Sequence, residues 1–589
     1  MSTPKLIHKV VCIANDHRLA AIISSYFTQL GCYFCVFESP RVKRHDVINE
    51  VLGITNTLAK LQPDVVFFAG LTPAATDLLK TRLPKELIVE LHSHADLCKL
   101  VEYKQNRQTL RCRSSLLAEG LVICAREGKV LEISETSDYL TADSGKRPFL
   151  VVCERSNPVV EIIASNYAAS IDADFSLVEG PSRDDAEDLQ RLLASLYDLE
   201  VLAREEACRD VIKRLGKVLS DIHFEKRTAI TFITKGVPYG VTITNAPSTH
   251  LFSLLLGTTL PRIIMAEKRT PNVRATLLID PGLFRESETA AIHAILHEKH
   301  MHCKVLAHRD AIAINVSNAI DFFPYELLFI ASHVGELKGR RWHFNFKARD
   351  NSMHVGVMDV AACFALIQGT DQVKVTEFKT FISIDGIPRN SPEWKKIPRP
   401  LIEDYVYSNP KDGGIFKTES TEKIRAAAAI QLYDNAFMPM TYVLANFLSP
   451  VIFNNGCSSW IYLSERFMFA GARAYIGTLA AVNGLLAKPI AENFMKLCLS
   501  GMTISEAIWK SQGEVFHDSL IRPYALVGCH FSTLKVADTD QLDFLTRYLA
   551  WTARQWERKA DEPDTEDVKR NSREAARISL KYLTDLSSH

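Results

Sequence analysis

Two residues of the sequence combine a reactive side chain with surroundings that suit covalent hydrolysis. His333 follows the apolar run YELLFIAS, and Cys457 follows the apolar run PVIFNNG. Short apolar runs of this kind predict buried strands, and functional side chains gather at the carboxyl ends of strands in parallel sheets. If the two strands are neighbours, an imidazole and a thiol meet at one rim of the sheet, as a Cys–His nucleophile pair requires.

The residues around Cys457 favour its thiolate form. A free thiol has a pKa of about 8.5, so only a few per cent is ionised at neutral pH. His333 is a candidate base, and the segment WIYLSERFMFAG predicts a helix whose positive N-terminus would lie beside the sulfur. We expect Ser458 or Ser459 to cap this helix. We also expect the backbone N–H groups of Cys457 and Gly335 to face a tetrahedral oxyanion.

The elements that must position these residues form an α/β pattern. In the first half of the chain the strand-like runs VVCIAN, CYFCVF, PDVVFFAG and ELIVEL alternate with helical patterns. This predicts a Rossmann-like parallel sheet, although no G-x-G-x-x-G supports dinucleotide binding. A second alternation begins near Thr228 with TAITFIT and ATLLID and ends with PVIFNNG and ARAYIGTL. Its short apolar strands predict a second, mostly parallel sheet.

These patterns divide the chain into four predicted parts. They are an N-terminal Rossmann-like domain (1–180), a helical connector with one stripe of leucines (181–224), a second α/β domain (225–542) and a charged helical tail (543–589). The stretch from Asp385 to Thr421 is rich in Pro, Gly and charge, so we expect a long irregular or mobile loop beside the catalytic rim.

Composition narrows the functional classes. Lys plus Arg and Asp plus Glu both number 69, so net charge gives no reason to expect a nucleic-acid partner. The start lacks the pattern of a secretory signal, and no apolar run reaches the roughly 18 residues of a membrane helix. Thirteen cysteines, an odd number, favour reduced thiols over a disulfide framework. We therefore expect a cytoplasmic protein that does not enter membranes.

Residues 225–535 resemble a CHAT domain, the bacterial relative of caspases and separase. The resemblance rests on KGVPYGVTITNAP, LLIDPGLF with SETAAIHAIL, FIASHVG, IFNNGCSSW, and FAGARAYIGTL followed by IAENFMKLCLSGMTISEAIWKSQ. It implies a caspase-like α/β fold and a cysteine endopeptidase with a dyad of His333 and Cys457. Gly335, Gly456 and Ser458 would support the oxyanion, and no metal or organic cofactor is implied.

The sequence departs from the family pattern at two places. The usual His-Gly is His-Val-Gly here, which displaces Gly335 by one residue. The segment from Thr478 to Asn483, where relatives often select the substrate's P1 side chain, carries no ionised group. A buried charged P1 side chain would need an opposite charge, so we expect a small polar or apolar P1 residue. Glu336 is the residue that could select a basic one instead.

The resemblance also suggests a biological role. It is that of a regulated protease of bacterial antiphage defence, which cleaves a dedicated protein substrate such as a gasdermin-like pore former. An activating protein or ligand would then bind the N-terminal domain. The alternative is a non-catalytic scaffold or sensor that keeps the caspase-like fold, and the displaced Gly335 supports it.

Three other groups of residues could form functional sites. His293, His297 and His300 share one helix face and could ligate zinc, but a solvated histidine-rich face is the simpler interpretation. Cys32 and Cys35 lie in an apparent strand and would point to opposite faces, which favours structural thiols. The third group consists of His92, His94 and Asp96 after one strand and Cys153 in another, a pattern that could mark the N-terminal half as a degenerate caspase-like domain.

Overall fold

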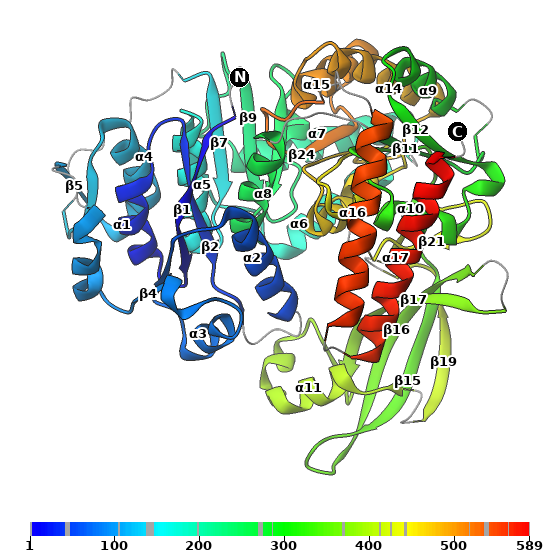
Figure 1. Cartoon of the computed structure of the whole chain (residues 1–589), viewed down its shortest axis with the longest axis horizontal. Coiled ribbons are helices and arrows are strands. Elements are labelled where there is room, and N and C mark those ends of the chain that lie inside the picture. The colour runs from blue at the N-terminus through cyan, green and yellow to red at the C-terminus, as the bar shows by residue number, and fades with distance from the viewer. Residues whose placement is uncertain are drawn as a thin grey trace.

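The protein is an α/β protein with two main sheets and an inserted antiparallel sheet (Figure 1). The computed structural model describes residues 3–41, 47–103, 107–136, 147–196, 199–268, 275–284, 287–367, 371–410, 414–424, 427–440, 444–517, 519–534, 541–562 and 565–587 of the 589-residue chain. Within these ranges no helix combines the length and the apolar character that crossing a membrane requires.

The N-terminal sheet is parallel, with the strand order β2-β1-β3-β4. Its strands are β1 (Lys5–Ala14), β2 (Cys32–Glu38), β3 (Val65–Ala69) and β4 (Ile88–Leu91). The nearby helices are α1 (His17–Phe27), α2 (Val47–Leu61), α3 (Pro73–Lys80) and α4 (Leu117–Glu127), and a small parallel pair joins β5 (Thr109–Cys112) to β6 (Val130–Ile133). The sequence predicted a parallel α/β arrangement here, and the structure confirms it.

A ten-stranded sheet forms the centre of the molecule, with the order β12-β11-β13-β22-β23-β24-β10-β9-β7-β8. Its strands are β7 (Phe149–Glu154), β8 (Asp174–Val178), β9 (Ala229–Thr234), β10 (Ser248–Phe252), β11 (Ala275–Asp280), β12 (His302–Ala307), β13 (Leu327–Ile330), β22 (Val451–Asn454), β23 (Ala474–Thr478) and β24 (Tyr524–Gly528). Because β23 and β24 are antiparallel, two parallel halves run in opposite directions. Their carboxyl ends therefore lie at opposite edges of the sheet.

The predicted domain boundary at residue 180 does not separate the two sheets. β7 and β8 precede this position, yet β7 pairs in parallel with β9. The strand order β8-β7-β9-β10 also repeats the order β12-β11-β13-β22. The chain thus starts the central sheet at β7, before the helices that the sequence suggested as a connector.

Helices cover both faces of the central sheet. α9, α14 and α15 share a core with β13, β22, β23 and β24, whereas α5, α8, α10 and α13 contribute to the larger core on the other side. The bounds are α5 (Pro158–Ser170), α6 (Arg183–Ser195), α7 (Val201–Val218), α8 (Leu256–Lys268), α9 (Thr289–Glu298), α10 (Ala313–Phe322), α13 (Ser459–Ala470), α14 (Gly484–Leu499) and α15 (Ile504–Val515).

An inserted sheet lies between residues 339 and 421, and its last elements, β18, α11 and β19, fall in the stretch from Asp385 to Thr421 in which the sequence suggested a long irregular loop. Its order is β18-β17-β16-β15-β19, with β15 (Gly339–Lys347), β16 (Met353–Leu366), β17 (Val373–Ile384), β18 (Ile387–Pro388), β19 (Ile415–Thr421) and helix α11 (Arg399–Tyr407). It projects at the bottom of Figure 1. Tyr405 of α11 is fully buried against Phe344 and Phe346. The expectation of an irregular segment from 385 to 421 is therefore wrong, because α11 and β19 pack onto strands distant in sequence.

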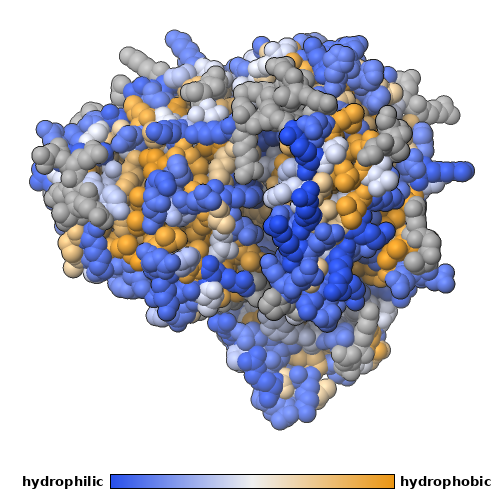
Figure 2. Space-filling model, viewed as in Figure 1, coloured by the Kyte–Doolittle hydropathy of each residue, from blue (hydrophilic) through white to orange (hydrophobic). Residues whose placement is uncertain are grey.

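The C-terminal residues form two long helices, α16 (Gln541–Asp561) and α17 (Glu566–Ser587). Trp556 packs edge-on against Phe322 of α10, and Tyr582 packs against Phe323. Figure 2 shows that the outer surface over this pair is mostly hydrophilic. The apolar stripe of the tail is thus used to hold it against the second half of the chain.

Candidate active site

His333 and Cys457 follow two neighbouring strands at matched positions. β13 and β22 are parallel partners, and Ile330 lies opposite Asn454 at the end of the ladder. The Asn455 N–H donates to Ile330 O over 2.9 Å, which extends the pairing by one residue. Each candidate residue is the third beyond that last pair. The two segments thus leave the same edge of the sheet side by side.

Gly456 keeps these two segments in close contact. A Cβ atom added to Gly456 would lie 2.3 Å from Val334 Cγ2 and 2.9 Å from Ser332 O. These neighbours flank His333 on both sides, so a larger residue would push the histidine segment away. The Gly456 N–H donates to Asn454 Oδ1 over 3.0 Å, which holds the turn before Cys457.

Both side chains can be reached by solvent. His333 is exposed and Cys457 is partly exposed. The His333 ring packs on Phe284, with 4.7 Å between the ring centroids, and its backbone carbonyl accepts from Gln431 N–H. Within the described residues no hydrogen bond joins the imidazole to the sulfur. Catalytic hydrogen bonds often tighten only around a bound substrate.

The turn after Cys457 differs from the predicted cap. Ser458 adopts the left-handed conformation with φ of 52°, and its side chain makes no capping hydrogen bond. Ser459 is already helical, and its Oγ donates to Asn454 O over 2.9 Å. The expected serine cap is therefore absent, but α13 still begins two residues after the sulfur, with the positive end of its dipole on that side. A left-handed serine costs conformational energy, which the surrounding contacts must offset.

Thr478 and Asn483, two candidate substrate-binding residues, have structural roles. Thr478 is fully buried, and its Oγ1 donates to Gly456 O over 2.7 Å. Its side chain therefore supports the Cys457 turn and does not line the rim. Asn483 is exposed and caps α14, because its Oδ1 accepts from Leu485 N–H over 2.9 Å. Glu336, the third candidate, is partly exposed in the short strand β14 (Val334–Glu336).

The Gly335 amide belongs to a short antiparallel ladder. β14 pairs antiparallel with β20 (Ala428–Gln431), and Gly335 lies opposite Ala429. Hydrogen bonds at His333 O and Leu337 N–H flank this pair at alternate positions. Gly335 therefore occupies a hydrogen-bonded position of the ladder, where its N–H faces Ala429 O. Of the two amides proposed from the sequence, that of Cys457 makes no hydrogen bond to the described residues and is the better donor.

A buried polar network behind Cys457 escaped the sequence analysis. Asn455 Nδ2 donates to Glu288 Oε1 over 2.6 Å, and the Tyr524 hydroxyl donates to Asn455 Oδ1. Glu288 is almost fully buried, and burial raises the pKa of its carboxyl group. These partners lie 167 and 69 residues from Asn455 in sequence, so no local motif could reveal them. The network holds the end of β22 from both sides.

Most other cysteine thiols are poorly reactive because they are buried. Burial raises the pKa of the Cys112 and Cys363 thiols to about 11 and those of Cys124 and Cys303 to about 12. The pKa is raised still further at several fully buried thiols, namely Cys12, Cys35, Cys153, Cys498 and Cys529. These thiols stay protonated at neutral pH, so they are poor nucleophiles.

The remaining motifs gain no support as sites. The rings of His293 and His297 lie 6.2 Å apart, and the described part of the chain contains no cluster of three or more side chains that could hold a metal ion. Cys32 and Cys35 both lie in β2. His92 follows β4 of the N-terminal sheet, whereas Cys153 lies in β7 of the central sheet. The echo of a His and Cys pair in the first half is therefore wrong, because the two residues belong to different sheets.

Comparison with known proteins identifies no relative by sequence. No family model matches the chain, and no curated protein matches it. Among solved structures, the complex of Porphyromonas gingivalis RgpB pro- and mature domains matches with a TM-score of 0.32 and 11% identity, covering 66% of this chain and 80% of that chain. A likeness of this size supports no inference about activity, so the case for function rests on the site itself.

Proposed function

We propose that the protein is a cysteine peptidase in which Cys457 is the nucleophile and His333 the general base. The observation that carries this proposal is their placement, each three residues beyond the last paired residues of two adjacent parallel strands. Partial exposure of the thiol and the glycine contact behind it add to the case. The finer assignment, a caspase-like enzyme of the CHAT type, comes from the sequence resemblance.

In the proposed reaction, His333 accepts the thiol proton and the sulfur attacks the scissile carbonyl carbon. The Cys457 N–H, next to the start of α13, would stabilise the oxyanion. The C–N bond then breaks as the imidazolium donates its proton to the leaving amine, which leaves a thioester on Cys457. Water attacks the thioester as it transfers a proton to His333; the C–S bond then breaks, the free acid leaves, and the imidazolium returns the proton to the Cys457 thiolate.

A thiol-reactive peptide probe tests this proposal on the full-length chain. We expect a fluorescent acyloxymethyl ketone peptide to label Cys457, and we expect Cys457→Ala and His333→Ala each to abolish labelling. Cys98 is an exposed thiol and His92 an exposed histidine, so Cys98→Ala and His92→Ala are matched controls that should label normally. Labelling that is independent of His333, or that falls mainly on Cys98, would contradict the dyad.

The competing function is a non-catalytic scaffold or sensor. The scaffold function is favoured because the Gly335 amide is paired in the ladder with Ala429. The Cys457 amide would then be the one remaining donor of the two proposed for an oxyanion. In that case Cys457 should react with small alkylating agents at the rate of an ordinary exposed thiol. The rate constant for iodoacetamide, compared between Cys457 and Cys98, therefore separates the two functions.

The sequence resemblance extends the proposal to biology. It suggests a regulated protease of bacterial antiphage defence whose substrate is a protein such as a gasdermin-like pore former. It also suggests control by an activating protein or ligand at the N-terminal half. Co-expression with candidate pore-forming proteins from neighbouring genes, followed by mapping of the cleavage site, tests the substrate.

A further inference from the structure

A large apolar cavity lies at the edge of the central sheet opposite His333 and Cys457. Its volume is about 530 Å³, within the range of pockets that hold small organic ligands. Residues from α2, α8, the last turn of α13 and the inserted sheet line it. Four parts of the chain that are distant in sequence therefore meet around one space.

Exposed apolar side chains converge on this cavity, whose lining also includes the cations Lys60 and Arg466. Leu52, Met440 and Phe447 line it while remaining 37%, 43% and 46% exposed. Met265 of α8 and Phe469 of α13 continue the apolar lining inward. Exposed apolar side chains that converge on one cavity mark a binding site more often than scattered ones do.

Arg262 brings a positive charge into this apolar wall. Its Nη2 donates to Met468 O of α13, but its Nε is buried and has no hydrogen-bond partner. No carboxylate of the described residues forms an ion pair with it, and burial lowers the pKa of its guanidinium to about 10. Arg262 is partly exposed as a whole, and a cation that lines a cavity without an ion-pair partner gains from an anion placed beside it. The lining thus combines a hydrocarbon surface with a place for one negative charge.

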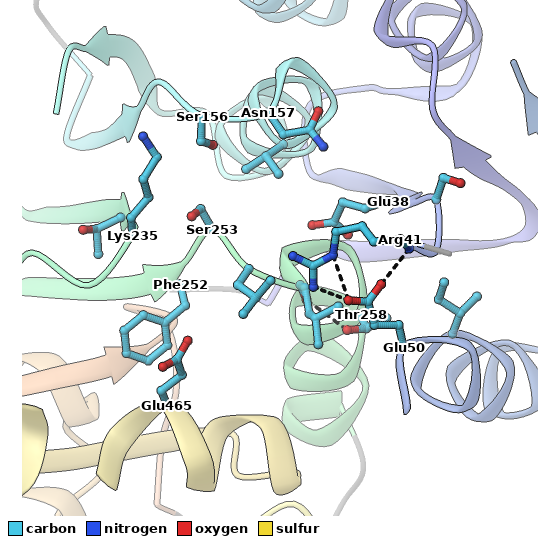
Figure 3. Close-up of a pocket in the computed structure, with 16 residues that line it drawn as sticks. Glu38, Arg41, Glu50, Ser156, Asn157, Lys235, Phe252, Ser253, Thr258 and Glu465 are labelled. Carbon is cyan, nitrogen blue, oxygen red and sulfur yellow. Dashed lines mark hydrogen bonds and ion pairs between the residues drawn. The ribbon is translucent and has the colours of Figure 1, made fainter. Parts of the chain in front are cut away.

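A polar cavity of about 400 Å³, drawn in Figure 3, shares several lining residues with the apolar one. Arg41, Glu50 and Thr258 line both spaces. The Arg41 guanidinium binds the buried Glu50 carboxylate, so this pair is neutral as a unit. Glu38, on the polar side, accepts from Gly257 N–H over 3.0 Å. Glu50 thus neutralises the Arg41 charge, whereas Arg262 has no such carboxylate partner among the described residues and is the better partner for an anion.

We propose that the apolar cavity binds an amphipathic carboxylate, with the carboxylate at Arg262 and the hydrocarbon chain along Leu52, Met440 and Phe447. A carboxylate beside Arg262 would balance the charge of the guanidinium, because guanidinium and carboxylate groups match in geometry. The hydrocarbon would shield the exposed apolar residues from water. This inference does not depend on the proposed peptidase activity.

Direct binding to the full-length protein tests the proposal. Isothermal titration below the critical micelle concentration should show saturable binding of dodecanoate, with much weaker binding of 1-dodecanol and of dodecyltrimethylammonium. Arg262→Met should weaken dodecanoate binding by about tenfold or more, as expected for loss of a charge-assisted hydrogen bond, and should leave dodecanol unaffected. Arg262→Lys should give an intermediate loss.

A second variant guards against misfolding of the Arg262 variants. Leu52→Glu places a negative charge on an exposed helix face at the cavity mouth and should also weaken dodecanoate binding by about tenfold or more. Its matched control is Leu202→Glu on α7, where the leucine is 80% exposed and remote from the cavity lining; this variant should bind normally. Absence of saturable binding, equal affinity for the three amphiphiles, or equal losses in Leu52→Glu and Leu202→Glu would each overturn the proposal.

Discussion

Replacement of Gly456 by alanine should separate His333 from Cys457 without touching either side chain. The new Cβ would lie 2.3 Å from Val334 Cγ2 and 2.9 Å from Ser332 O. Carbon atoms in contact lie about 3.5–4.0 Å apart, so the first approach is too short by more than 1 Å. The Val334 methyl group could rotate away, but the Ser332 carbonyl belongs to the backbone. The segment that carries His333 must therefore move.

The size of the effect follows from this displacement. Overpacking of a close contact typically costs about 1–3 kcal/mol of stability. A shift of about 1 Å between reacting groups can lower a rate by about a hundredfold. We expect Gly456→Ala to lower the rate constant for labelling of Cys457 by the peptide probe by about ten- to a hundredfold and to lower the thermal midpoint by a few degrees.

Gly335→Ala is the matched control for this prediction. Gly335 is the second residue after His333, and an added Cβ there meets no atom within 4 Å. It should therefore label and melt like the original protein. The double variant Gly456→Ala with Val334→Ala should recover part of the lost rate, because it relieves one of the two contacts. Normal labelling in Gly456→Ala, with an unchanged melting temperature, would refute the idea that this glycine sets the spacing of the dyad.

Three further predictions concern stability. Burial raises the pKa of Glu38 to about 7. Because the folded pKa lies above the unfolded value, the stability that protonated Glu38 contributes is fully present below about pH 4.5 and is lost as the pH rises through about 7. Glu38→Gln should therefore melt higher than the original protein at pH 8, with the gap closing at pH 4.5; a gap independent of pH would contradict this. Arg473 and Glu267 form an ion pair at 3.1 Å with side chains 9% and 4% exposed, so Glu267→Gln should cost about 3–5 kcal/mol in urea unfolding, because it leaves a buried cation unpaired. Tyr405→Phe, which removes a hydrogen bond to Val357 O, should speed hydrogen exchange in residues 339–421 and leave labelling of Cys457 unchanged; a change spread over the whole chain would argue against a separately stabilised insert.

The position of the candidate site was predictable because strand ends leave local signals. FIASH and FNNGC each place a polar residue directly after an apolar run, and the structure puts both at one edge of the sheet. The structure of the segment between these two strands could not be predicted from local signals. The sequence around Tyr405 is typical of a loop, but Tyr405 packs against Phe344 and Phe346, which are distant in sequence. The ladder that engages Gly335 likewise depends on Ala429, more than ninety residues later.

The reversal of strand direction within the central sheet brings α13 into contact with both halves of the chain. The helix starts beside Cys457 at the carboxyl end of β22 and must return to the opposite edge, where β23 begins. Its twelve residues span about 18 Å. At that far edge the reversed strands β9 and β10 present their own carboxyl ends, so the end of α13 meets the cavity that contains Arg262. Trp460 packs against His250 and Phe252 of β10, and Arg262 binds the Met468 carbonyl. Residues from the first half of the chain thus contact α13, the helix after Cys457, near its start and near its end. Arg466 of α13 also lies over the Phe378 ring of the inserted sheet, so the helix that begins beside Cys457 contacts the first half of the chain, the cavity and the insert.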